Sequence, residues 1–454
     1  MAAMPGRPHP IDTAIIGGGF SGTLLAVNLV RHQGPACAII ERRSDAGLGL
    51  AYSTATRSHL LNVRAANMSA LPDDPGHFAR WAARMCSASG SCFVPRADYG
   101  RYLNSLLQEA RADATDRLML QSGEVVALQP STAGYRLTLD NGTALEARRV
   151  VLATGNLPAR TPGGVDAAAL GSTYVNDPWA SDSWLGQDPL APILLIGTGL
   201  TAVDVALLLR DSGHQGPLIA ISRRGQTPRP HGDPAPVPPL AEPPDATALA
   251  ILRHLRVQTD SIGWRAAIDQ LRPHSQTLWR KMTPAEKQRF LRHARTWWDV
   301  HRHRMAPEVA ARLAAMAADG SFRAIAGRFL ATLPTATGAE VTVRRRDGGL
   351  ERLEVGRIVN CTGPGELAGS DHPLIRTLLG SGLARPDPLG MGVDTDHLGR
   401  VIGHGGALTP NLFAVGPLTR GSFWEITAVP DIRHQVWTLA RLLSNAHWVG
   451  GEGL

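Results

Sequence analysis

One stretch, residues 11–41, constrains the fold of this 454-residue chain more than any other. An apolar run at 14–16 predicts a β-strand, and residues 23–31 have the apolar spacing of a helix. Between them lies a glycine-rich turn with the spacing GxGxxG, formed by Gly17, Gly19 and Gly22. Strand, glycine turn and helix in this order are typical of a dinucleotide-binding βαβ unit, so a parallel α/β sheet is predicted here.

The glycines of this turn have separate mechanical roles. Gly17 permits the tight turn, Gly19 lets the backbone approach a pyrophosphate, and Gly22 lets helix and strand pack closely. Phe20 and Ser21 lie among them, next to a helix end whose free N–H groups and positive charge favour a phosphate. These five residues form the predicted pyrophosphate site.

A second strand, at 36–40, ends on an acidic residue, Glu41. A carboxylate at this place is positioned to accept hydrogen bonds from a ribose 2′-hydroxyl. Arg42 follows directly, and we include it in the predicted cofactor site.

The same plan returns in the second half of the chain, at 193–222. A strand again leads into a glycine-rich turn, here with the spacing GxGxxA and Ala202 in the last place. The residues predicted to bind this second dinucleotide are Gly197, Gly199, Leu200 and Thr201.

The second copy ends differently from the first. Ser222, Arg223 and Arg224 stand where the first copy has Glu41. Replacing a carboxylate by a hydroxyl and two guanidiniums suits a 2′-phosphate, so NADPH is expected rather than NADH.

Later segments complete both copies. The sequence RRVVLATG before residue 156 is repeated as RIVNCTG before residue 364, and NLFAVG predicts a further strand of the first domain. A helix is expected to begin near Thr427, with its positive end toward a flavin ring. The predicted cofactor residues in these segments are Thr154, Gly155, Gly416 and Thr427.

The repeat predicts an α/β protein with two Rossmann-like dinucleotide-binding domains, and the resemblance given below implies FAD for the first and NADPH for the second. The expected FAD domain comprises 1–170 and 356–454, and the expected NADPH domain is 171–355, with a helical insertion at about 245–330. In the insertion, Thr283-Pro-Ala-Glu is a capping box. The apolar residues expected on the core face of the following helical stretch are Phe290, Leu291, Ala294, Trp297, Trp298 and Met305.

An alternative for the insertion is a lid that meets an anionic substrate. Its candidate residues are Arg292, Arg295, His301 and Arg304. A metal site made of His301 and His303 is disfavoured, because residues two apart do not share a helix face.

The bulk composition excludes several classes of protein. The net charge of +7 comes from dispersed basic residues, so a solvated surface is favoured and nucleic-acid binding is not expected. The N-terminus lacks the apolar core of a signal peptide, and the longest apolar run contains glycines and an aspartate, so a cytoplasmic protein without a membrane span is expected. The four cysteines form no CxxC pair, which argues against a disulfide reductase.

The motifs GGGFSG with Glu41, VVLATG, GTGLTAVD and NLFAVG resemble the flavoproteins with two dinucleotide-binding domains, FAD first and NADPH second. HLLNV, MSALP and WEITAVP are similar to segments of bacterial FAD/NAD(P)-binding proteins. HLLNVRAANMSALPDDP also resembles a segment of the flavin monooxygenases. That resemblance implies that Asn62 lies by the flavin and hydrogen-bonds the oxygen adduct or NADP.

Two departures from the monooxygenase pattern are visible. Asn176 stands where the family fingerprint has a histidine, and Pro417 follows Gly416 where an aspartate usually contacts the ribityl chain. The resemblance implies that FAD binding survives, with easier exchange.

These features together predict an FAD-dependent, NADPH-consuming monooxygenase that acts with oxygen on a small anionic or nitrogen-rich substrate. Resemblance favours the urate hydroxylases, followed by the N-hydroxylases of amines. The alternatives are an NADPH-dependent reductase or electron donor, and a flavin-binding sensor or scaffold without turnover. The sequence makes no prediction of oligomeric state.

Overall fold

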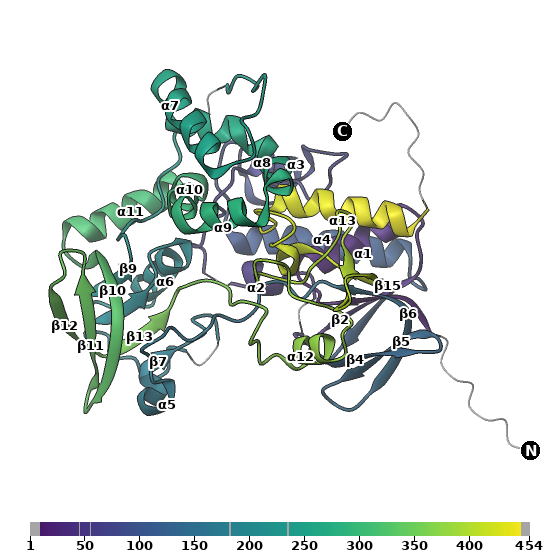
Figure 1. The fold of residues 1–454 in the computed structure, drawn as a ribbon, viewed down its shortest axis with the longest axis horizontal. Helices are drawn as coiled ribbons and strands as arrows, with labels where there is room; N and C mark the ends of the chain where they lie inside the picture. The colour runs from purple at the N-terminus through teal and green to yellow at the C-terminus, as the bar shows by residue number, and fades with distance from the viewer. Residues whose placement is uncertain (1–9, 45, 55, 181–182, 234–235, 446–454) are drawn as a thin grey trace, which may run out of the picture. The chain divides into compact units, whose positions relative to one another are not determined.

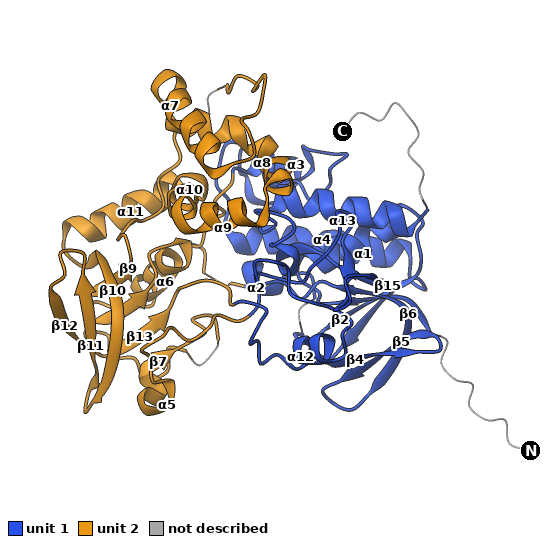
Figure 2. Ribbon diagram, viewed as in Figure 1, with its two compact units in different colours: residues 1–53, 64–157, 366–454 blue, residues 54–63, 158–365 orange. Residues whose placement is uncertain are grey.

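The computed structural model describes residues 10–44, 46–54, 56–180, 183–233 and 236–445. The chain forms two compact units (Figure 2). Unit 1 comprises 1–53, 64–157 and 366–454, and unit 2 comprises 54–63 and 158–365. The observed units therefore differ from the sequence-based boundaries, because three segments expected in the FAD domain, 54–63, 158–170 and 356–365, group with unit 2.

Unit 1 is built on a parallel sheet whose strands come from both ends of the chain. In spatial order these are β14 (Arg400–Ile402), β15 (Leu408–Ala414), β6 (Ala144–Leu152), β1 (Ile11–Ile16), β2 (Cys37–Glu41) and β3 (Leu118–Ser122). All neighbours are parallel except β14 and β15. Residues 14–16 of β1 and 37–40 of β2 are buried on both faces, and both segments are runs of apolar residues.

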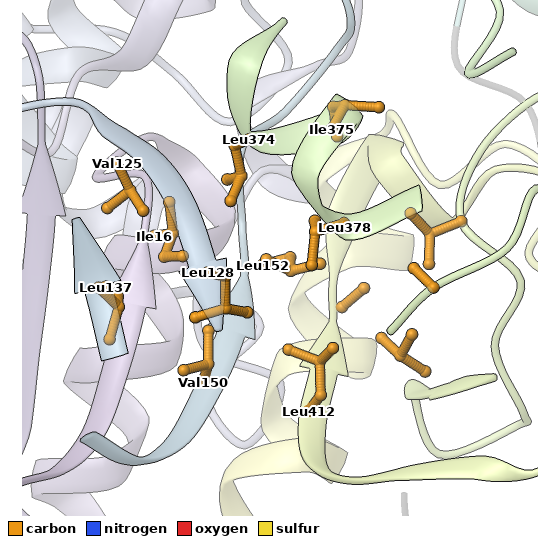
Figure 3. Packing of buried hydrophobic residues seen from close by; sticks show 14 of the residues in the cluster. Ile16, Val125, Leu128, Leu137, Val150, Leu152, Leu374, Ile375, Leu378 and Leu412 are labelled. Atoms are coloured by element: carbon orange, nitrogen blue, oxygen red, sulfur yellow. The ribbon is translucent and has the colours of Figure 1, made fainter. Parts of the chain in front are cut away.

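An antiparallel hairpin pairs with the first residues of β6, 144–147, ahead of those that pair with β15. It consists of β4 (Val125–Ser131) and β5 (Gly134–Leu139), and the turn at Asn141-Gly142 joins β5 to β6. Helix α12 (Pro373–Gly380) packs on this part of the unit. Figure 3 shows its side chains Leu374, Ile375 and Leu378 among buried strand residues, which makes this a core of unit 1.

Further helices of unit 1 are labelled in Figure 1. They are α1 (Phe20–Arg31), α2 (Gly49–Tyr52), α3 (His77–Cys86), α4 (Arg96–Asp113) and α13 (Val429–Leu443). Helix α1 follows the first glycine turn and packs against α4 and α13. Helix α1 begins three residues before its expected start, so it includes Ser21 and Gly22. Helix α13 begins after the expected Thr427, because Pro430 occupies its first turn and Ala428 is its N-cap.

Unit 2 repeats the parallel core of unit 1. Its strands in spatial order are β12 (Leu350–Val355), β11 (Gly338–Arg345), β10 (Phe322–Thr335), β9 (Leu218–Ser222), β8 (Ile193–Ile196), β13 (Arg357–Asn360) and β7 (Tyr174–Val175). The strands from β10 to β7 are parallel, and β10 to β12 form an antiparallel hairpin pair. Helix α6 (Leu200–Asp211) corresponds to α1, and a short helix, α5 (Ala167–Leu170), precedes β7. The predicted fold class, two Rossmann-like α/β domains, is confirmed.

The insertion of unit 2 lies between β9 and β10 and is helical, as predicted. Its helices are α7 (Ala248–Leu271), α8 (Ser275–Lys281), α9 (Pro284–His293), α10 (Arg295–Arg302) and α11 (Pro307–Ala318). Strand β10 begins at Phe322 and pairs with β9, so it takes up the last part of the segment expected as the insertion, about 245–330. Among the described residues, no helix has the length and apolar character needed to cross a bilayer.

Most of the insertion begins and ends at one place, where Arg229–His231 and Met305 are hydrogen-bonded to each other. We call this junction the neck. There His231 N–H donates to the Met305 carbonyl (3.0 Å), and Met305 N–H donates to the Arg229 carbonyl (2.9 Å). Arg265 closes the neck from the side through two hydrogen bonds to the Pro230 carbonyl. Residues 232–304 thus lie between the two segments that meet at the neck, and α11 then leads the chain to β10.

Candidate functional site: two glycine turns

The glycine turn of unit 1 has no room for larger residues at two of its positions. Gly17 has φ +105°, and a Cβ there would lie 2.5 Å from the Ala153 carbonyl oxygen. A Cβ at Gly22 would lie 1.9 Å from the Gly17 carbonyl oxygen. Both contacts are with backbone, which cannot swing away. The close helix–strand packing inferred from the sequence is therefore a steric requirement.

The start of α1 presents unpaired backbone donors. Gly19 is its N-cap in extended conformation, with no side-chain cap and no acidic residue in the first turn. Phe20 and Ser21 are its first two residues. An uncapped helix start of this kind suits an anionic group such as a pyrophosphate.

A second glycine-rich loop borders this helix start and was not identified from the sequence. Gly47 N–H donates to the Gly18 carbonyl (2.7 Å), and a Cβ at Gly49 would lie 2.9 Å from the Gly19 Cα. Gly47 and Gly49 both have positive φ. The sequence GLGL carried this signal, but nothing local showed which turn it would contact.

Glu41 is the last residue of β2 and lies against the glycine turn. Its carboxylate accepts hydrogen bonds from Gly18 N–H (2.6 Å) and Arg43 N–H (3.0 Å). A carboxylate oxygen has more than one acceptor direction, so both oxygens can also accept from hydroxyls. Arg42 is exposed and pairs with Glu124 (3.3 Å), which makes it a surface ion pair next to the site.

The C-terminal cofactor motif lies against the same helix start. Gly416 has φ +70°, and a Cβ there would lie 2.3 Å from Ser21 Oγ. Gly416 N–H donates to Gln435 Oε1 (2.7 Å), and Gln435 Nε2 donates to Thr419 Oγ1 (3.0 Å). Gln435, on α13, therefore fixes the turn in which Pro417 replaces the usual aspartate. Sequence reasoning missed it.

Two further predicted positions lie at the end of β6. Thr154 Oγ1 is buried and has no hydrogen-bond partner among the described residues, and Gly155 has φ +75° with open space around its Cα. Both features fit a bound group beside this strand end. Thr427, by contrast, is exposed and precedes α13 instead of starting it.

The glycine turn of unit 2 reproduces the geometry of the first. Gly197 has φ +125°, and a Cβ there would lie 2.4 Å from the Cys361 carbonyl oxygen. Gly199 is the uncapped N-cap of α6, with no acid in the first turn, and Leu200 and Thr201 are the first helical residues. The N–H of Gly197 donates to the Ile221 carbonyl (2.8 Å), just as Gly17 donates to Ile40 (2.9 Å).

Where unit 1 has Glu41 at the end of its second strand, unit 2 has a hydroxyl followed by two guanidiniums. Ser222 Oγ accepts hydrogen bonds from Thr198 Oγ1 (2.9 Å) and Gly225 N–H (3.0 Å). Arg223 is exposed, and Arg224 is half-buried beneath the ring of Trp297 (5.1 Å from Cζ to the centroid). No ion pair joins either arginine to a described residue. The site is thus electropositive where unit 1 is acidic.

Asn62 lies in the segment 54–63, which packs with unit 2. His231 Nε2 donates to the Asn62 carbonyl (3.0 Å), so the neck of the insertion holds the backbone at this position. His59, buried in the same segment, hydrogen-bonds through Nε2 to the Asp204 carbonyl of α6 (2.9 Å). The role of Asn62 at a flavin remains a prediction.

Asn176, which replaces the family histidine, forms a polar junction inside unit 2. Its Oδ1 accepts hydrogen bonds from Tyr174 Oη (2.8 Å) and Asn360 Nδ2 (2.8 Å), and its Nδ2 donates to the Ala159 carbonyl (3.1 Å). These contacts connect β7, β13 and the chain entering the unit. Asn176 therefore has a structural role here.

The basic residues proposed for a lid are largely used in structural contacts. Arg304 is 5% exposed and binds Asp269 through both terminal nitrogens (3.0 and 2.9 Å). Arg295 pairs with Asp299 (3.3 Å), and His301 Nδ1 hydrogen-bonds to the Trp297 carbonyl (2.8 Å). The Arg304 guanidinium is thus engaged within the insertion, by Asp269 and by the carbonyls of His301 and Arg265, and the alternative of a lid that meets an anion stays untested.

Trp297 also differs from the sequence prediction. It is 42% exposed, whereas the other aromatic residues of this stretch, Phe290 and Trp298, are buried. The helix breaks at Ala294, between α9 and α10, so the spacing counted across the break does not describe one continuous face.

The cysteines do not form a redox pair among the described residues. Burial raises the pKa of the Cys37 thiol to about 12 and raises the pKa of the Cys361 thiol still further. Cys86 is half-buried, and Cys92 is exposed. Buried, protonated thiols of this kind are poor nucleophiles.

Residues 14–157 match the family model described as FAD-NAD(P)-binding. This match covers the first glycine turn, Glu41 and the Thr154-Gly155 strand end, and it confirms the predicted FAD/NAD(P)-type domain in unit 1. No curated protein matches the chain.

The whole chain is similar in fold to solved N-hydroxylating monooxygenases. L-lysine 6-monooxygenase from Pseudomonas syringae is 17% identical (TM-score 0.66; 96% of this chain and 100% of that chain covered). An ornithine hydroxylase from Pseudomonas aeruginosa in reduced form is 15% identical (0.65; 96% and 99%). A Kutzneria ornithine N-hydroxylase with reduced FAD, NADP+ and L-ornithine is 16% identical (0.64; 96% and 99%). Thioredoxin and bacillithiol disulfide reductases match with TM-scores between 0.52 and 0.56. These likenesses confirm the predicted flavoprotein oxidoreductase fold over nearly the entire chain.

Proposed function

We propose that the protein is an FAD-dependent monooxygenase that consumes NADPH and hydroxylates a small anionic or nitrogen-rich substrate. The observation that carries the proposal is the pair of glycine turns, equal in backbone geometry and opposite in charge at the following strand end. A chain that holds two such turns suits two different dinucleotides.

The residues of unit 1 fit FAD. The α1 N–H groups and the close glycines hold the pyrophosphate, Glu41 accepts hydrogen bonds from ribose hydroxyls, and Gln435 keeps the Gly416 turn in place. FAD, when bound, supplies hydride acceptance from NADPH and reaction with oxygen. The unpartnered hydroxyl of Thr154 donates to, or accepts from, the bound group.

The residues of unit 2 fit NADPH. The start of α6 holds the pyrophosphate, Ser222 hydrogen-bonds a ribose oxygen or its phosphate, and Arg223 and Arg224 neutralise the 2′-phosphate. Guanidinium–phosphate pairs are short, charge-assisted and geometrically selective. Selection of NADPH over NADH follows from these contacts.

Oxygen chemistry is favoured over disulfide reduction for two reasons. The buried thiols Cys37 and Cys361 have raised pKa values and lie in the sheets of different units. In addition, the full-chain fold matches the N-hydroxylating monooxygenases with higher TM-scores than the disulfide reductases. A reductase that passes electrons to another acceptor is the second candidate, because it needs no thiol pair.

The substrate proposal combines two sources. The basic and aromatic insertion suits a small anion, with urate as the specific candidate, and the matched monooxygenases bear the names of lysine and ornithine enzymes. Asn62 is the proposed catalytic residue; its backbone is fixed by His231, so its amide is presented from an ordered segment.

The test uses the purified, FAD-saturated chain with NADPH and oxygen. Urate, L-ornithine and L-lysine are added separately, and NADPH oxidation, oxygen uptake and hydroxylated product are measured together. Product formed in proportion to NADPH supports the proposal. Steady turnover with artificial electron acceptors and no oxygenated product from any nitrogen-rich substrate supports the reductase instead. If saturating urate does not accelerate NADPH oxidation, urate is excluded as the substrate and the rest of the proposal stands.

A further inference from the structure

One of the free guanidiniums in unit 2 is held by the helical insertion. Arg224 lies two residues beyond β9, and its Cζ is 5.1 Å from the ring centroid of Trp297 on α10. Trp297 is 42% exposed, while the adjacent Trp298 is 6% exposed. An aromatic ring left this open beside a cation is placed where a ligand of that cation would arrive.

Among the described residues, no hydrogen bond or ion pair engages the N–H donors of Arg224. Stacking engages the flat face of a guanidinium, whereas its N–H donors lie in the plane. No described carboxylate pairs with Arg224 or with its neighbour Arg223. Other arginines of the insertion are neutralised, as Arg304 is by Asp269 and Arg295 by Asp299.

The position of Trp297 is itself fixed. Its carbonyl accepts a hydrogen bond from His301 Nδ1 (2.8 Å), and the ring of His301 packs edge-on against Trp264 (4.9 Å between centroids). One residue before His301, the Val300 carbonyl accepts a hydrogen bond from Arg229 N–H (2.8 Å) at the neck. The indole is therefore presented from a helix whose C-terminal half is tied to unit 2.

We propose that Trp297 is a specificity-determining residue for nucleotides with a 2′-phosphate. Its ring orients the guanidinium of Arg224, so the arginine side chain loses less conformational entropy when a phosphate binds. Binding of the phosphate is thereby favoured over binding of a ribose hydroxyl. The helical insertion thus takes part in nucleotide selection. This inference rests on the proposed use of NADPH by unit 2.

The experiment measures binding of 2′,5′-ADP and of 5′-AMP to the FAD-saturated full-length chain by titration calorimetry. Trp297→Ala is expected to weaken 2′,5′-ADP about two- to fivefold, the range of a partly exposed cation–π contact, and to leave 5′-AMP unchanged. Trp297→Phe, which keeps a ring with a weaker quadrupole, retains part of the affinity. Arg224→Ala is expected to lose about tenfold or more, as for a charged hydrogen bond.

Trp437→Phe in unit 1 is the matched control, because Trp437 also stacks on an arginine, Arg31 (5.8 Å), but lies outside the second motif. A Trp297→Ala variant that binds 2′,5′-ADP as tightly as the unchanged chain overturns the inference, as does equal weakening of both ligands. If the unchanged chain itself binds both ligands equally, the NADPH proposal fails. Thermal unfolding of each variant separates loss of folding from loss of binding, and Trp297→Phe decides the matter if Trp297→Ala does not fold.

Discussion

The two glycine turns are alike in backbone at their first glycine and at the helix start, and they differ in several side chains. Both begin with a glycine of positive φ packed on a carbonyl of the neighbouring strand, and both end in an uncapped helix start. Unit 1 has Gly22 and Glu41 where unit 2 has Ala202 and Ser222. Unit 1 also has Gln435 beneath a second turn. On the proposed function, the backbone at these turns allows a dinucleotide to bind, and a few side chains decide which one.

The largest effect is expected at Gly22. Gly22→Ala places a Cβ about where it collides with the Gly17 carbonyl, and overpacking against fixed backbone costs ~1–3 kcal/mol or more. We expect the variant to lose bound FAD during purification. The reciprocal change, Ala202→Gly, costs about 0.5–1 kcal/mol and preserves NADPH binding. Flavin absorbance per chain is the measurement, and normal FAD content in Gly22→Ala would contradict the packing argument.

The charge difference is tested by Arg223→Ala. Removing a charged hydrogen bond of about 1.5–3 kcal/mol raises the KM for NADPH roughly 10- to 100-fold and leaves that for NADH nearly unchanged. Steady-state kinetics with both nucleotides decide this. Ser222→Glu, which installs the acid of unit 1, is expected to shift preference toward NADH; an equal effect of Arg223→Ala on both nucleotides refutes the specificity argument.

The support that Gln435 gives to the Gly416 turn of unit 1 is tested by Gln435→Leu. This change leaves the buried N–H of Gly416 without its acceptor, at a cost of ~1–3 kcal/mol. The expected result is faster release of FAD, which is measured as the recovery of flavin fluorescence. Gln435→Glu is the control, because it keeps the acceptor oxygen; if both variants release FAD at the unchanged rate, Gln435 does not support the turn.

The cysteines allow a smaller test of equivalence. Cys361 contacts Gly197 as Ala153 contacts Gly17, so Cys361→Ala gives unit 2 the residue that unit 1 has at this place. The variant is expected to lose only ~1 kcal/mol of folding stability. A thiol with a pKa of about 12, such as Cys37, is about one part in ten thousand thiolate near pH 8. Iodoacetamide should therefore modify Cys92 and spare Cys37 and Cys361. Mass spectrometry reports this, and modification of Cys361 in the folded chain contradicts it.

The smallest effect concerns pH. His214 follows α6 at the place that Gly34 has after α1, and burial together with Arg210 lowers its pKa. The unfolded chain then binds more protons, so stability is fully present above about pH 6.5 and declines as the solution is acidified. His214→Gln is expected to flatten the decrease in unfolding midpoint between about pH 8 and pH 5.5. His293→Gln, at an exposed position, is the control and should not alter the slope.

The sequence predicted what local spacing controls. The glycine turns, Glu41 and Ser222 lie within single βαβ units, where strand and helix bring them together without other information. Gln435 and Gly49 could not be found in this way, because their contacts depend on distant segments folding onto the turns. Trp297 was misplaced since a break at Ala294 is not visible in the spacing. The ion pair of Arg304 could not be found either, because its partner Asp269 lies on another helix.

The neck at Arg229–His231 and Met305 has an evolutionary consequence. A segment that leaves and rejoins a domain at hydrogen-bonded neighbours can be exchanged between genes without disturbing the sheet beneath it. An exchange of residues 232–304 would bring a new surface to unit 2, but it would also remove the indole that contacts Arg224. On the roles proposed for Trp297 and for the insertion, recombination at this junction would alter coenzyme choice and substrate range in a single step, and the two traits would be inherited together.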